Sequence, residues 1–153
     1  MKAMKLGWII FALTSIFSAY VIGTSPSGIE IPVHWNIDGE PDRYGSVMEA
    51  MLVGPAVMLL ILTVMSVLKY IEPRQENLRK SDTARGWIAL ATVILMLIIT
   101  AANYFIIQGY EVPMVRVVFS GVGLMFMILG NFFQKIRSNF FLGLRTPWTL
   151  SSD

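Results

Sequence analysis

Apolar residues gather into four long runs, separated by short polar segments. The clearest run is residues 87–107, and its first part, WIALATVILMLIITAA, contains no charged side chain. A helix rises about 1.5 Å per residue, so a run of this length crosses a hydrocarbon core of about 30 Å. Three further runs of comparable length occupy residues 6–23, 47–70 and 114–133. The pattern predicts four transmembrane helices.

The runs are continuous rather than alternating, which favours helices over the strands of an outer-membrane barrel. The chain is 55% hydrophobic and only 14% charged, and its mean hydropathy is +0.63. These values lie outside the usual balance of a soluble domain. We therefore predict an all-α membrane protein, with residues 1–153 forming a single integral membrane domain.

The basic residues predict the orientation. Of the 12 lysines and arginines, all but Arg43 and Arg116 fall before the first run, from the end of the second run (Lys69) to the start of the third, or after the fourth. Under the positive-inside rule, both termini, the loop 71–86 and the tail 134–153 are cytoplasmic, and the loop 24–46 is extracellular. The pI near 9.0 is explained by this anchoring, and no nucleic-acid partner is expected.

The first run has an alternative interpretation as a signal peptide. Lys2 and Lys5 would form its basic region, and the vicinity of residues 18–20 would provide the cleavage site. Removal of this run would leave three spans. The chain has no cysteine, so the extracellular loop must be held by packing and turns rather than by a disulfide.

The extracellular loop is predicted to be irregular. Alternating apolar positions and a proline favour an extended segment over residues 29–35. Asp38-Gly39 predicts a tight turn, and the chain then continues irregularly to the next helix. Ser46 is a candidate cap for that helix, with Glu49 complementing its dipole.

This loop also carries the chain's only histidine, His34, which is followed by Trp35, Asp38 and Asp42. We interpret these four residues as a candidate extracellular ligand-binding set. Imidazole and carboxylates also ligate divalent cations, so His34, Asp38 and Asp42 are weak metal candidates. The competing interpretation places His34 and Trp35 at the membrane interface with the acids in water. No cofactor is predicted.

Polar groups within the spans require partners or a route to water. Glu49 and Arg116 have opposite charges at similar depths, which suggests an intramembrane pair, although both could instead be solvated at the interface. Asn103 lies near the extracellular end of its span. Small and polar residues at alternating steps of three and four in the fourth run predict a packing stripe; these are Arg116, Ser120, Gly123, Met127 and Gly130.

The segment 130–150, GNFFQKIRSNFFLGLRTPWTL, begins inside the fourth run and is unusually specific. Its aromatic and basic residues suit a helix end that turns onto the inner membrane surface, with membrane lipid as a partner. That explanation accounts for the residue classes but not for their order. The positions that define this cytoplasmic motif are Asn131, Arg137, Asn139, Gly143, Arg145, Thr146, Pro147 and Trp148.

The order of these residues resembles the signature of the SdpI-like immunity and signal-transduction membrane proteins of bacteria. In that family a span ends in Gly-Asn, a basic aromatic segment follows, and Gly-hydrophobe-Arg-Thr-Pro-Trp-Thr-Leu closes the motif. The extracellular loop is similar to the family's amino-terminal domain as well. Its matching positions are Pro32, His34, Trp35, Gly39, Pro41, Asp42 and Tyr44.

The resemblance implies a non-enzymatic, multi-pass protein of the bacterial cytoplasmic membrane. It implies immunity to a membrane-acting peptide toxin bound outside, signalling across the membrane, or both, with capture of a transcriptional regulator inside. Longer family members continue into further helices after this motif, so the chain is expected to be a short or a truncated member. The alternatives are a small transporter or metal-dependent membrane enzyme using His34, and a scaffold for a cytoplasmic regulator.

Overall fold

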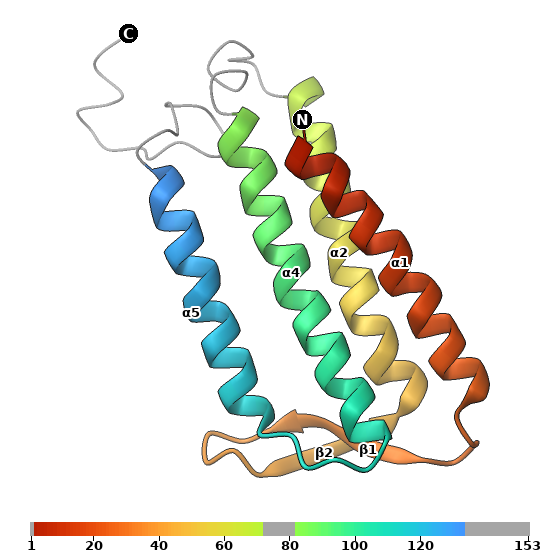
Figure 1. Ribbon diagram of the computed structural model, residues 1–153. Coiled ribbons are helices and arrows are strands. Elements are labelled where there is room, and N and C mark those ends of the chain that lie inside the picture. Colours follow the sequence, from red (N-terminus) through yellow and green to blue (C-terminus); the bar gives the residue numbers. More distant parts are fainter. Residues whose placement is uncertain (1, 72–81, 134–153) are drawn as a thin grey trace, which may run out of the picture.

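The computed structural model describes residues 2–71 and 82–133. Each of the four predicted spans corresponds to a helix, and two strands lie between the first and second helices (Figure 1). The elements are α1 (Lys2–Thr24), β1 (Glu30–Trp35), β2 (Pro41–Ser46), α2 (Val47–Ile71), α4 (Asp82–Ile107) and α5 (Met114–Phe133). The predicted all-α membrane fold is confirmed, with a small sheet added.

Within residues 2–71 and 82–133, three helices are long and apolar enough to cross a membrane: α1, α2 and α4. The fourth helix, α5, is apolar over Met114–Gly130. The sequence places the start of the third span at residue 87, but α4 begins at Asp82. The extra turn carries Arg85 into the helix, and Arg85 is buried there rather than solvated in the loop.

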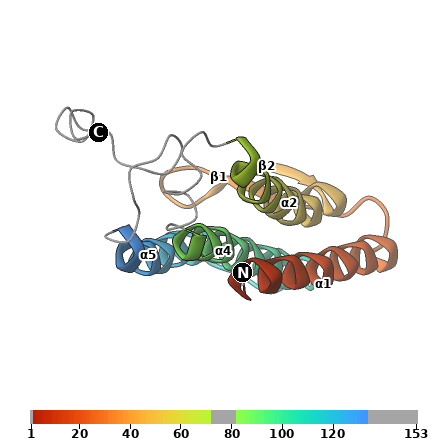
Figure 2. The same ribbon diagram turned by 90° about the horizontal axis from the view of Figure 1, so that it is seen from above.

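Helix α4 occupies the centre of the bundle. It packs against α1, α2 and α5, and α1 also packs against α2. Seen along the helices, α1, α4 and α5 form a row, and α2 lies on one side of it (Figure 2). The core between α1, α2 and α4 includes Met58, Leu62 and Val93.

Gly54 allows α2 to approach α4 closely. A Cβ at this position would overlap the hydroxyl of Thr100 on α4 and lie 3.4 Å from the Met96 carbonyl oxygen. Thr100 is 1% exposed, and its hydroxyl donates to that same carbonyl at 2.8 Å. The helix continues through Pro55 without interruption. Small side chains here permit helix contact in a medium that offers no hydrophobic drive for it.

The packing stripe expected on α5 was wrong. Its five residues are all exposed, and a Cβ added at Gly123 or Gly130 would meet nothing within 4 Å. The face that contacts α4 instead includes Gly121, where an added Cβ would lie 2.6 Å from Leu95. The small residues do follow helical spacing, but spacing alone does not indicate which face of α5 meets α4.

The extracellular loop is a β-hairpin, not the irregular loop that the sequence predicts. Strands β1 and β2 are antiparallel, with irregular register around His34. Residues 41–46 lack apolar alternation, and β2 is largely exposed. Its extended conformation therefore depends on hydrogen bonding to β1 rather than on burial of its own side chains. The hairpin lies across the outer ends of the helices, opposite the amino terminus (Figure 1).

A candidate functional site at the outer end of the bundle

The hairpin turn is organised by Asn36. Its side-chain oxygen accepts hydrogen bonds from the backbone amides of Asp38 (3.0 Å) and Glu40 (2.9 Å). Gly39 has a φ of +87°, which a residue with a side chain rarely adopts. The predicted tight turn at Asp38-Gly39 is confirmed, whereas the part played by Asn36 was missed. The sequence signal for it is an asparagine side chain that can bind backbone amides two residues on.

His34 and Asp42 come together on the hairpin. The His34 Nδ1 atom lies 2.6 Å from an Asp42 carboxylate oxygen, and the two side chains are 63% and 43% exposed. Asp38 does not join them in a metal site: no three histidine, cysteine, aspartate or glutamate side chains gather in the ranges 2–71 and 82–133. The exposed pair can donate and accept hydrogen bonds to a ligand at the membrane surface.

Glu49 pairs with Arg43 and not with the predicted partner Arg116. The Arg43 Nη1 atom donates to the Glu49 carboxylate at 2.7 Å, while Arg116 is exposed on α5. A hairpin strand that runs directly into α2 brings Arg43 within reach. Gly45 leaves room for the carboxylate, which occupies the place of a Cβ there. The predicted Ser46 cap is confirmed, because its hydroxyl accepts from the Glu49 amide at 3.2 Å.

A cavity of about 410 Å³ lies between β1 and the beginning of α5. The hairpin contributes one wall, which includes His34 and Trp35, and α5 contributes the apolar opposite wall. Ile37 at its rim is 98% exposed. Volumes of this size accommodate small ligands or a few side chains of a peptide. The lining residues are Val33, His34, Trp35, Asn36, Ile37, Met114, Val115, Val118 and Phe119.

A second cavity, of about 150 Å³, extends from the first toward the helix core. Val33, Trp35, Met114 and Val118 line both cavities. The inner cavity also contacts the Arg43–Glu49 pair and Asn103. The Asn103 amide donates to the Ala50 carbonyl at 2.9 Å, so this buried polar group is satisfied by α2. The two cavities together form an apolar recess with polar groups at both ends.

Of the predicted extracellular set, His34, Trp35 and Asp42 therefore lie together on the hairpin, and Asp38 lies in its turn. Most of the cytoplasmic motif falls outside the described residues: Arg137, Asn139, Gly143, Arg145, Thr146, Pro147 and Trp148. Asn131 lies in α5, but its side chain is outside the described part of the chain.

Comparison with known proteins identifies the kind of membrane protein that carries this hairpin. Residues 9–59 match a family described as a domain of unknown function (DUF1648). The match covers most of α1, the hairpin and the outer half of α2. The immunity protein SdpI of Bacillus subtilis (strain 168) is 28% identical over 156 residues, which cover 100% of this chain and 70% of that protein.

The chain is similar to SdpI over its whole length. It is a multi-pass protein of the bacterial membrane, as the apolar helices require. No solved structure matches the chain.

Proposed function

We propose that this SdpI-like protein protects its cell from a membrane-acting peptide toxin, and that the outer cavity receives an apolar part of the peptide. The main support for this proposal is the cavity of about 410 Å³ between β1 and α5. It is apolar on the α5 side and has His34 and Asn36 on the hairpin side. The similarity to an immunity protein also supports a protective role.

The geometry suits an amphipathic peptide that arrives along the membrane surface. The exposed Ile37 and the cavity walls offer apolar contact, and the His34–Asp42 pair lies nearby on the same hairpin. Burial of apolar side chains would supply most of the affinity, and the polar groups would orient the peptide. We propose that the protein acts by binding and not by catalysis.

Toxin survival tests the proposal. Deleting the gene from its host should increase sensitivity to related membrane-acting peptides, and expression of the full chain should restore survival. Membrane insertion of the expressed chain is checked in parallel by immunoblot of the membrane fraction. Unchanged sensitivity after deletion would show that immunity is the wrong function.

Signalling to a cytoplasmic regulator remains a separate prediction that rests on the tail motif. It is tested by co-purification from membranes of cells that carry the full chain, Arg145→Ala or Trp148→Ala. Loss of a specific partner in either variant would support signalling. Identical partner profiles would count against a docking function of the tail.

A further inference from the structure

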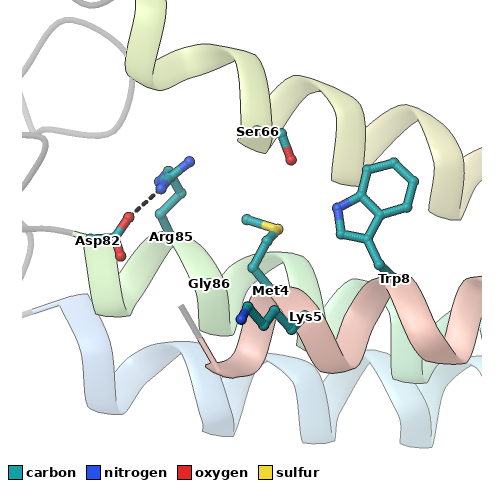
Figure 3. A pocket seen from close by; sticks show the side chains of 7 residues that line it. All are labelled: Met4, Lys5, Trp8, Ser66, Asp82, Arg85 and Gly86. Atoms are coloured by element: carbon teal, nitrogen blue, oxygen red, sulfur yellow. Dashed lines mark hydrogen bonds and ion pairs between the residues drawn. The ribbon is translucent and has the colours of Figure 1, made fainter.

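A pocket of about 170 Å³ lies at the other end of the bundle, between α1, α2 and α4. Figure 3 shows its polar side chains: Lys5 and Trp8 from α1, Ser66 from α2, and Asp82 and Arg85 from α4. By the distribution of basic residues, this is the cytoplasmic end. The pocket does not share a lining residue with the outer cavities.

Arg85 is the most unusual group in this pocket. The residue is only 8% exposed. One guanidinium nitrogen donates to the Met65 carbonyl of α2 and another to the Asp82 carboxylate. The Nε–H is buried without a hydrogen-bond partner among the described residues. A buried charged donor without an acceptor is costly, so the Arg85 guanidinium favours negative charge beside it.

The other lining groups add hydrogen-bond donors to the pocket. In the described part of the chain, the Lys5 ammonium, the Trp8 indole N–H and the Ser66 hydroxyl have no protein partner. All three can donate hydrogen bonds. Among the described lining residues, Asp82 is the only acidic one, and it already accepts from Arg85. Two cations and one anion leave the lining with an excess positive charge.

A mostly apolar pocket with a few donors and a positive charge is complementary to an amphipathic group that has acceptor oxygens and a negative charge. Phosphate fits this description, and arginine and lysine are its usual protein partners. Met4 and the Trp8 ring make the remaining lining apolar, which favours a phosphate attached to a lipid. Basic pockets between transmembrane helices on the cytoplasmic side are suited to anionic headgroups.

We propose that the Arg85 pocket binds the phosphate of an anionic phospholipid headgroup from the inner leaflet. The phosphate oxygens accept from Lys5, Trp8 and Ser66 and lie beside the Arg85 guanidinium. The bound lipid thereby connects the cytoplasmic ends of α1, α2 and α4. Free phosphate offers the same acceptor chemistry, so the experiment must distinguish the two sources.

The experiment titrates the purified full chain in maltoside detergent with phosphatidylglycerol and counts bound lipid by native mass spectrometry. Lys5→Gln should weaken binding by about tenfold, because a hydrogen bond to a charged group is lost. Trp8→Phe keeps the ring and removes only the N–H, and it should weaken binding by about threefold. Lys2→Gln is the matched control: it makes the same charge change on α1 but does not line the pocket.

A second titration uses inorganic phosphate alone and is followed by isothermal titration calorimetry. Lys5-dependent binding of phosphatidylglycerol supports the lipid site. Lys5-dependent binding of inorganic phosphate alone supports the anion pocket with a soluble ligand. The proposal is overturned if neither ligand binds, or if Lys5→Gln and Lys2→Gln have the same effect. Neither test variant removes Arg85, so the result does not depend on the folding of an arginine variant.

Discussion

The two ends of the helix bundle hold their charged groups in opposite ways. At the outer end, the His34–Asp42 pair on the hairpin and the Arg43–Glu49 pair between the hairpin and α2 are exposed, with side-chain exposures between 39% and 63%. At the cytoplasmic end, Arg85 is buried and donates to the α2 backbone and to Asp82. Exposed ion pairs contribute little to stability, whereas removing one partner of a buried pair is strongly destabilising. The outer pairs therefore contribute little to the stability of the bundle, whereas Arg85 links α4 to α2 at the inner end.

The largest difference between the ends should appear when each arginine is removed. Arg85→Ala loses the bond to the Met65 carbonyl and the countercharge of Asp82, and we expect a loss of about 2–4 kcal/mol of unfolding free energy. The measurement is reversible unfolding of the full chain in mixed micelles. A loss below about 1 kcal/mol would show that Arg85 does not fix the helix ends.

Packing beneath the outer hairpin is tested at Gly54. Gly54→Ala would force its Cβ against Thr100, and we expect a loss of about 1–3 kcal/mol in the same assay. Adding Thr100→Ala to Gly54→Ala removes the overlapping hydroxyl, so the double variant should recover part of that loss. Gly123→Ala is the control, because a Cβ there meets nothing within 4 Å. Equal effects at the two glycines would contradict the close contact of α2 with α4.

The smallest effect is expected at the exposed outer pair. Arg43→Ala should lower the unfolding free energy by less than about 1 kcal/mol, because solvent screens the Arg43–Glu49 contact. The loss should shrink further at high salt. A loss as large as that of Arg85→Ala would abolish the proposed difference between the two ends.

The sequence predicted the helices well, since each follows from a long apolar run that lipid accepts only as a helix. It did not predict β2, which has little apolar alternation of its own and is ordered by its partner strand. It also placed Arg85 in a solvated loop. The available signal was Asp82 three residues before Arg85, a spacing that pairs side chains on one helix face.

The candidate site was predicted in part. His34, Trp35 and Asp42 were chosen by residue type, and the structure brings them onto one hairpin. The α5 wall of the cavity could not be predicted, because Val115 and Phe119 look like any lipid-facing residues in a span. The predicted partner of Glu49, Arg116, was wrong. Position along the spans and charge can be read from the sequence, but the path of the hairpin that brings Arg43 to Glu49 cannot.

If the proposed immunity acts through the outer cavity, filling that cavity should abolish protection. Val115→Trp places a large ring on the α5 wall of the cavity, whereas Leu124→Trp makes a comparable addition on α5 outside the lining. Both variants are expressed in the deletion strain, matched for membrane abundance, and challenged with the peptide toxin. We expect Val115→Trp to lose protection and Leu124→Trp to retain it. Full protection by Val115→Trp at equal abundance would contradict the account.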